Sequence, residues 1–208
     1  MAEEPTADPV STTREDWLNA ALRVLMDEGA AAVKVMTLAQ RLGCSRSSFY
    51  WFFNDREAVL RALLDHWRAR NTSAIVERAG RPAARVSEAV LNVFECWADP
   101  ALFDAKLDFA VREWARRSPD VARAVHEADE ERLTALTAMF ARFGADAKEA
   151  VVRARTLYFM QIGYYALEVQ ETNLQRNALL RQYVEVFSGE VPEAADLRRF
   201  EALAKGAS

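Results

Sequence analysis

The sequence has few of the residues that build disulfides, metal sites and phosphate loops. It contains two cysteines, two histidines and seven glycines in 208 residues. Cys44 and Cys96 lie far apart without a CxxC pairing, which favours reduced thiols acting as buried fillers over a disulfide framework or a redox sensor. His66 and His126 stand apart from the cysteines and from each other. Since glycine-rich loops and Gly-x-Ser-x-Gly patterns are also missing, we expect no metal, no cofactor and no enzyme activity.

Signals for export or membrane insertion are missing as well. Residues 1–11 are acidic, contain two prolines and lack an apolar core, so we expect a disordered lead-in and not a signal peptide. The longest apolar-rich run, 156–167, is too short to cross a bilayer and includes a glutamine. We therefore expect a cytoplasmic protein without a membrane partner.

The net charge is −4, but its sign reverses over one short stretch. Residues 31–56 contain four basic residues and one acidic residue, a local charge of +3. A small basic island on an acidic body suits contact with a particular DNA site better than nonspecific coating of nucleic acid.

The hydrophobic pattern has helical spacing throughout, and no useful length of sequence alternates as a strand does. We expect an all-α fold. Thr12 followed by Glu15 predicts a capping box that starts the first helix. Helices are expected over about 12–28, 36–42, 45–53, 55–78, 86–98, 101–116, 119–143, 146–170 and 175–188, with a short one after 192. They divide into a helix-turn-helix domain over 12–56 and a helical domain over 57–208.

The most informative pattern lies in residues 34–57. A short helix with an apolar face meets a polar-tipped second helix at Gly43, as in a helix-turn-helix, which lays its second helix in the DNA major groove. Phe49 and Phe53 are four residues apart and can share a buried side, which leaves their neighbours to face outward. The alternative is that the aromatic run is only core and that Arg46 is a solvated charge. The position of the run in a three-helix pattern favours DNA contact.

Arginine can fork to guanine edges or to phosphate, and serine and tyrosine commonly bind phosphate. The candidate DNA contacts are Lys34, Arg46, Ser47, Ser48, Tyr50, Trp51 and Arg56.

Three groups of motifs follow one another over about 12–64. They are Thr13-Arg14-Glu15, Ala20-Ala21, the apolar tract Leu22 to Met26 and Gly29; then Leu38-Ala39 and Leu42-Gly43; then Tyr50, Phe52-Phe53 and Arg56-Glu57. Together they resemble the N-terminal part of the TetR family of bacterial one-component regulators. The departures are Lys34 in place of a helix-capping threonine, Ser47 in place of glycine, Phe52 in place of histidine or tyrosine, and Arg56 in place of lysine.

The resemblance implies a homodimeric, ligand-responsive repressor. Its partners would be a palindromic double-stranded DNA operator and a small organic effector that releases it from DNA. A transcriptional activator is an alternative, because that depends on where the operator lies. A further alternative is a dimeric all-α small-molecule-binding protein or enzyme that keeps a non-functional helix-turn-helix.

The effector site is predicted from aromatic side chains in the helical domain, since ligand sites are mostly apolar with a few placed polar groups. The candidates are Phe94, Trp97, Phe103, Phe109, Trp114, Tyr158, Gln161 and Tyr165. Gln161 interrupts an otherwise apolar helix and needs a partner, which either a ligand or a neighbouring helix could supply. Arg112 could pair with Asp129 or Glu130, or anchor an anionic ligand.

The dimer interface is predicted from helix 156–167, which is apolar in almost every direction and must be covered all round. The next long helix carries a second apolar stripe. Two such helices from each chain would form a four-helix interface, and a purely intramolecular core is the alternative. The candidate interface residues are Ile162, Gly163, Leu179, Leu180, Tyr183 and Phe187.

Overall fold

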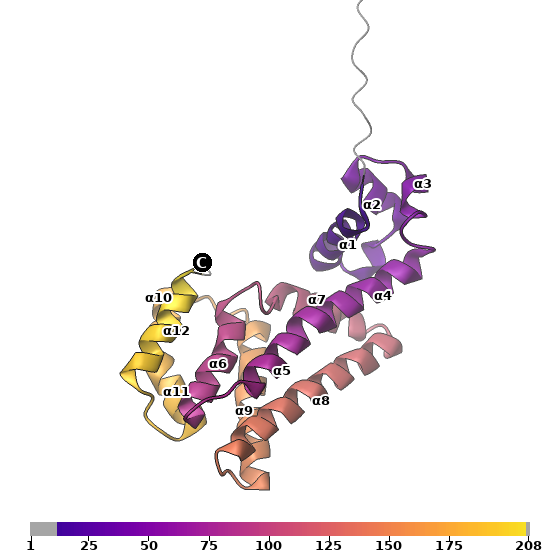
Figure 1. The fold of residues 1–208 in the computed structure, drawn as a ribbon. Helices are drawn as coiled ribbons and strands as arrows, with labels where there is room; N and C mark the ends of the chain where they lie inside the picture. Colours follow the sequence, from indigo (N-terminus) through magenta and orange to yellow (C-terminus); the bar gives the residue numbers. More distant parts are fainter. Residues whose placement is uncertain (1–11, 207–208) are drawn as a thin grey trace, which may run out of the picture.

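The computed structural model describes residues 12–206, apart from the side chains of 173 and 174, and every regular element in that range is helical (Figure 1). In chain order the elements are α1 Arg14–Glu28, the 3-10 turn η1 Ala30–Ala32, α2 Val35–Leu42, α3 Arg46–Phe49, α4 Arg56–Trp67, the π-helical turn η2 Arg68–Thr72, α5 Ser73–Gly80, α6 Val86–Ala98, α7 Ala105–Ala115, α8 Pro119–Arg142, α9 Ala147–Ala166, α10 Asn173–Ala178, α11 Leu180–Ser188 and α12 Ala194–Gly206. The expected all-α class is confirmed. The expectation of disorder for 1–11 falls outside the described residues.

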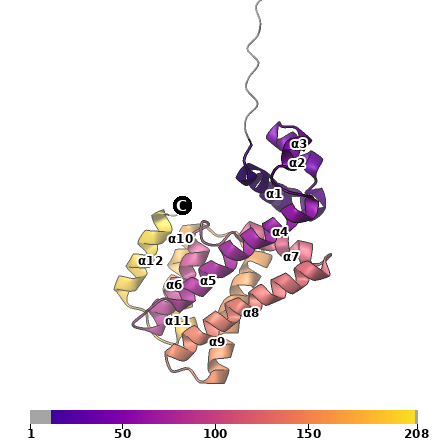
Figure 2. The same ribbon diagram turned by 45° about the vertical axis from the view of Figure 1, so that its right-hand side comes forward.

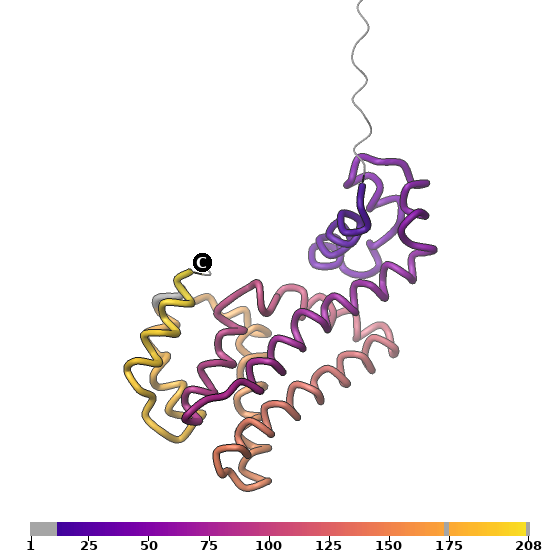
Figure 3. Tube along the Cα trace, viewed as in Figure 1, coloured from indigo at the N-terminus to yellow at the C-terminus, as the bar shows by residue number. Residues whose placement is uncertain are grey.

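The N-terminal bundle, α1 to α3, stands at one end of α4 and away from the C-terminal helices (Figures 1 and 2). The chain then runs through α4, the π-helical turn and α5 as one continuous rod, which Figure 3 shows passing from the bundle into the rest of the molecule. Helix α8 packs along α5 and α7, and α9 packs against α8. Helices α11 and α12 pack on α6 at the far side.

The apolar side chains form two cores. The first combines α1 to α4 with α7 and the start of α8, and Trp17, Leu63 and Val111 are among its fully buried members. The second combines α5, α6, α9, α11 and α12 with the second half of α8. Because α4 and α7 belong to the first core, the N-terminal bundle rests on the helical domain through apolar contacts.

Several helix ends differ from the sequence expectation. The capping box of α1 forms at Thr13 with Asp16, one residue later than Thr12 with Glu15, and the Thr13 N–H donates to the Asp16 carboxylate over 2.8 Å. Helix α9 stops at Ala166, short of residue 170, because Glu168 adopts a left-handed conformation with φ of 48°. The expected helix over 175–188 is divided in two at Leu179.

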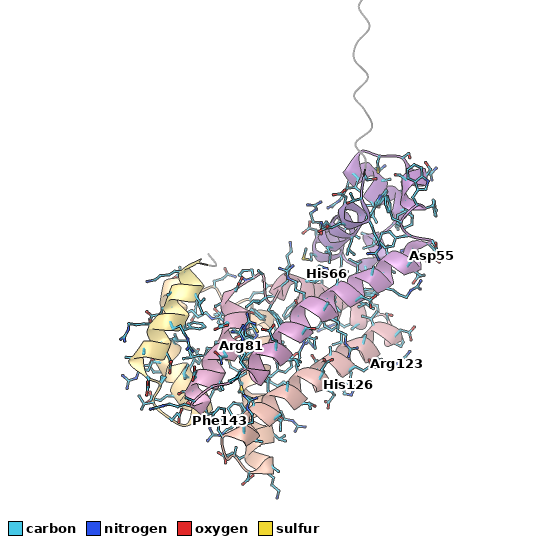
Figure 4. All side chains as sticks on the ribbon, viewed as in Figure 1. Asp55, His66, Arg81, Arg123, His126 and Phe143 are labelled. Carbon is cyan, nitrogen blue, oxygen red and sulfur yellow. The ribbon has the colours of Figure 1, made fainter. Side chains whose placement is uncertain are left out.

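The rod formed by α4 and α5 also departs from a simple helix. The backbone N–H of Ser73 donates to the carbonyl oxygen of Arg68, five residues back, which is the bonding of a π-helix and inserts one extra residue into the turn. Side chains along this rod are marked in Figure 4, where Asp55 lies at its start beside the N-terminal bundle and His66 lies further along α4. Asp55 caps the rod, since its carboxylate accepts the N–H of Ala58.

Candidate DNA interface and effector cavity

The turn between α2 and α3 is closed by Gly43. This residue has φ of 63° and ψ of 29°, a left-handed conformation that glycine adopts without steric cost. Phe49 on α3 is fully buried, and its ring meets the Trp17 ring of α1 edge-on with centroids 5.3 Å apart. Phe53 stacks on Phe49 at 5.6 Å. These aromatic contacts fix the orientation of α3 on the bundle.

The chain after α3 is wound more tightly than the expected helix over 45–53. The N–H groups of Tyr50, Trp51 and Phe52 each donate to the carbonyl three residues back, which is 3-10 geometry. This winding turns two large aromatic side chains outward, with Trp51 81% and Tyr50 58% exposed.

The predicted DNA contacts divide into those left free and those engaged within the protein. Arg46, Ser47 and Lys34 are exposed. Ser48 is half-buried, and its hydroxyl donates to the Ser45 carbonyl over 2.7 Å. Ser47 shares a 2.8 Å hydrogen bond with the Ser45 hydroxyl. The exposed charged side chains among the predicted contacts are therefore those of Lys34 and Arg46.

Arg56 points into the protein. Its Nε donates to the Val33 carbonyl over 2.7 Å, and its Nη2 donates to the Ala30 carbonyl over 2.8 Å. A third nitrogen pairs with Glu57 at 3.1 Å. The side chain thus ties the start of α4 to the turn after α1.

A cavity of about 60 Å³ lies in the C-terminal part, between α6, α9, α10, α11 and α12. Three of the eight predicted effector residues line it: Phe94, Trp97 and Gln161. The predicted interface residues Leu180 and Tyr183 line it as well. The remaining lining comes from Ala98, Met160, Tyr164, Glu171, Arg176, Asn177, Phe200 and Ala204.

The other five predicted effector residues lie elsewhere. Phe103 is buried and stacks on Tyr165 with centroids 5.9 Å apart. Tyr158 is buried in a polar network on α8 and α9. Phe109 and Trp114 face a groove between α7 and the N-terminal bundle. The predicted aromatic residues are thus divided among the core, the polar network and the groove. Helices α6, α7 and α9 each contact several neighbouring helices, so aromatic residues on different faces of one helix meet different surroundings.

A buried ionic network joins the rod to α7, α8 and α9. Asp108 and Arg132 are both fully buried, with 3.2 Å between their charged groups. Arg112 donates to both oxygens of Asp129 over 2.7 and 2.9 Å, which confirms the predicted bridge. The Tyr158 hydroxyl accepts from Arg132 over 2.8 Å. Burial alone would raise the pKa of Asp108, but the charges of Arg132 and Arg112 hold that pKa below its usual value.

The π-helical turn is held by the same region. The Asn71 amide donates to the Asp104 carbonyl over 2.9 Å and accepts the Asp104 N–H over 3.1 Å. Arg132 donates to the hydroxyl of Thr72 over 3.1 Å. The rod is therefore clamped to α7 and α8 where its helical bonding changes.

The predicted interface residues are also divided. Leu180 and Phe187 are each 5% exposed and belong to the core of their own chain. Ile162, Gly163 and Tyr183 are half-buried, and Leu179 is exposed. The large apolar side chains left uncovered on α9 and α11 are Val152, Phe159 and Val186.

Sequence reasoning missed Arg176, Tyr164 and Phe200. Arg176 lies in a polar stretch between two apolar helices, which is typical of a connection, and Phe200 lies on the short helix after Pro192. Their approach to Gln161 depends on the chain reversing after α9, for which the sequence holds no local signal. Over the described residues, no helix is long and apolar enough to span a membrane, and no group of His, Cys, Asp or Glu could hold a metal ion.

The N-terminal bundle and the rod that carries it define a helix-turn-helix DNA-binding protein. Residues 18–63 match the sequence profile of the N-terminal domain of bacterial regulatory proteins of the tetR family. No curated protein matches the sequence. The N-terminal domain is therefore that of a TetR-type transcriptional regulator.

Solved structures share the whole fold at low sequence identity. PfmR, a TetR family transcriptional regulator from Thermus thermophilus, is similar with a TM-score of 0.65 and 18% identity over 89% of this chain and 100% of that one. AmtR of Mycobacterium smegmatis is similar with a TM-score of 0.64 and 17% identity over 98% of this chain and 99% of that one. FadR of Bacillus subtilis, solved with stearoyl-CoA, is similar with a TM-score of 0.62 and 15% identity over 86% of this chain and 100% of that one.

Proposed function

We propose that this regulator is a repressor that binds a palindromic operator as a homodimer and is released by a small organic effector. Residues 12–56 would contact DNA, and residues 57–208 would bind the effector and form the dimer. The observation that carries the proposal is the uninterrupted rod α4–α5, which links an exposed recognition helix to the helices around the cavity.

The recognition surface is formed by Lys34, Arg46, Ser47, Tyr50 and Trp51. All five are exposed, and together they combine two cations, a hydroxyl and two aromatic side chains on one end of the molecule. Cations and hydroxyls suit phosphate and base edges, and exposed aromatic side chains suit the thymine methyl group and sugar. Ser48 and Arg56 would support this surface from behind through their bonds to the backbone.

The dimer would be formed by the uncovered apolar side chains of α9 and α11. Phe159 is 54% and Val186 76% exposed, and Val152 and Leu179 extend the same helices. A second copy of the chain would bury these residues in a four-helix arrangement. Two recognition helices would then meet successive major grooves, which are about 34–36 Å apart.

Effector binding would act through the clamp on the π-helical turn. Helix α9 contributes both Gln161 to the cavity and Tyr158 to the ionic network, so a change in α9 reaches the rod through Arg132 and Thr72. The occupancy of FadR by stearoyl-CoA shows that the shared fold can accommodate an organic molecule in another regulator. A ligand that binds one arrangement of these helices better would shift the spacing of the recognition helices.

The test is selection of bound duplexes from a random-sequence pool, followed by fluorescence anisotropy on the selected duplex and a scrambled one across a salt series. We expect selective binding to a near-palindrome, lost in Arg46→Ala and Tyr50→Ala. The matched control is Arg123→Ala, an exposed arginine on α8 outside the recognition surface (Figure 4). Absence of selective binding would refute the proposal. Equal weakening on both duplexes by Arg46→Ala would assign that side chain to phosphate, whereas loss of selectivity would assign it to a base.

A further inference from the structure

One half of the Gln161 amide has no partner in the cavity. The side chain is 2% exposed, and its Oε1 accepts a hydrogen bond from Nη2 of Arg176 over 3.0 Å. Its Nε2 is buried without a hydrogen-bond acceptor among the described residues. Burial raises the pKa of the nearby Tyr165 hydroxyl, and Arg176 and Gln161 oppose that rise. The Gln161 Nε2 nevertheless makes no hydrogen bond of normal geometry to this hydroxyl. A buried donor without a partner costs free energy, so the site is incomplete without an acceptor.

Arg176 adds a positive charge beside this donor. Its guanidinium lies 4.4 Å from the centroid of the Tyr164 ring, and no carboxylate within the described chain forms an ion pair with it. Only one of its N–H groups is used by Gln161, so others remain for a ligand. Two donors, one of them charged, therefore meet at the same place.

The Glu171 carboxylate also lines this cavity, but it lies nearer to solvent than Gln161. Glu171 is exposed, and its carboxylate accepts a hydrogen bond from the Tyr164 hydroxyl over 3.1 Å. Because water screens an exposed charge, Glu171 opposes an anion at depth only weakly. The buried end of the cavity thus offers donors, and its opening carries the carboxylate.

The walls between these ends are aromatic. Phe94 and Trp97 lie with ring centroids 5.5 Å apart, and Tyr183 and Phe200 complete the lining. The present volume of about 60 Å³ holds a few waters at most, so a larger molecule must displace a wall. Helix α10, which carries Arg176, contributes no buried side chain among those described and is the wall least held by the core.

We propose that the effector is an aromatic organic anion, with its carboxylate or equivalent anionic group between Nε2 of Gln161 and the guanidinium of Arg176 and its ring between Trp97 and Phe200. The inference deepens the proposed function, since it rests on this cavity being the effector site. Closure of α10 over the bound anion would pair the Gln161 donor and extend the contact of α10 with α9.

The test compares two dyes that share a ring system and differ in charge: 8-anilinonaphthalene-1-sulfonate, an anion, and N-phenyl-1-naphthylamine, which is neutral. Dissociation constants are measured by fluorescence titration for the wild type and for Arg176→Met, Gln161→Met and Glu171→Gln. We expect Arg176→Met and Gln161→Met to raise the dissociation constant of the anionic dye by about tenfold or more. The dissociation constant of the neutral dye should change by less than about twofold. Glu171→Gln is the matched control at the opening of the cavity. It should leave the dissociation constant of the anionic dye unchanged or slightly lower.

Equal effects of Arg176→Met on both dyes, or no effect on either, would overturn the anion site. Arg176→Lys guards against a folding defect, because it retains charge without the fork and should recover part of the affinity for the anionic dye alone. Binding of dye-free protein to the selected operator duplex is measured in parallel. If the wild type binds the operator but the variants do not distinguish the anionic from the neutral dye, only the anion site is refuted. If the wild type does not bind the operator, the proposed function is refuted.

Discussion

Nη2 of Arg132 lies 3.2 Å from Oδ1 of Asp108, and neither side chain reaches solvent. The indole N–H of Trp67 donates to the same oxygen over 2.8 Å, so the rod shares the carboxylate with α8. Arg112 donates to the other oxygen over 2.7 Å. One carboxylate thereby joins the helix that carries the N-terminal bundle to two helices of the C-terminal part, and Asp108 is the residue on which that junction depends.

Replacing Asp108 by asparagine should strongly destabilise the protein. The change leaves the buried Arg132 without its closest opposite charge, and breaking a buried pair in this way costs about 3–5 kcal/mol. Urea denaturation followed by circular dichroism measures the free energy of unfolding. The control is Asp120→Asn, which removes the partner of Arg123 in an exposed pair on α8 and should change the unfolding free energy little. Equal effects of the two changes would contradict the assignment.

His66 should make stability depend on pH below about 6.5. Burial lowers the pKa of His66, the charge of Arg70 lowers it further, and Asp104 opposes the shift. Because the folded pKa lies below the unfolded value near 6.5, the unfolded chain binds more protons in this range, and the free energy of unfolding falls as pH drops from about 7 to 5. His66→Gln should remove that part of the slope.

The comparison is His126→Gln, a change of the same type at an exposed position on α8 (Figure 4). It is measured by urea denaturation at several pH values beside His66→Gln. An unchanged slope in His66→Gln would show that another group titrates there.

Arg46 on the recognition surface and Arg56 behind it should separate stability from DNA affinity. Arg56→Met loses hydrogen bonds to the carbonyls of Val33 and Ala30 and should cost about 1–3 kcal/mol of unfolding free energy. Arg46→Met should leave stability unchanged and weaken operator binding by about 1–3 kcal/mol. Thermal unfolding and anisotropy on the same preparations give both quantities. The reverse assignment would follow if Arg56→Met lowered DNA affinity without lowering stability.

A charge on the uncovered apolar face should prevent dimerisation. Phe159→Glu or Val186→Glu would bury an unpaired carboxylate between two copies, and we expect monomers at concentrations where the wild type is a dimer. Multi-angle light scattering measures the mass. Val191→Glu, at a valine that is 54% exposed in the connection after α11, is the control and should leave the mass unchanged. Monomers with all three variants, or dimers with all three, would place the interface elsewhere.

The helices could be predicted from the sequence where a side chain acts on its own backbone. Gly43, Asp55, Pro119 and Asp146 each set a helix end through local geometry, and those ends lie where the sequence indicates. The π-helical turn has no such local cause. It is held by Asn71 and Thr72 through partners 33 and 60 residues away, so only the folded chain reveals it.

The site was predicted less completely than the fold for the same reason. Exposure of Arg46 and Trp51 follows from burial of Phe49, which the four-residue spacing indicates. The direction of Arg56 does not follow, because charge gives no information on which carbonyls lie nearby. Phe109 and Tyr158 show the same limit for aromatic residues, since helix spacing identifies a buried face but not the neighbour that covers it.

The extra residue of the π-helical turn is absorbed within that turn. Its closing hydrogen bond spans five residues, whereas an α-helical bond spans four, so the wider turn accommodates one more residue while the helices on either side keep nearly the same rotation about the rod axis. The added residue therefore changes which side chains face α7 and α8, and it brings the buried Asn71 and Thr72 to Asp104 and Arg132. Deletion of one residue from this turn would leave the aim of the recognition helix nearly unchanged and would remove the attachment of the rod to the helices beneath it.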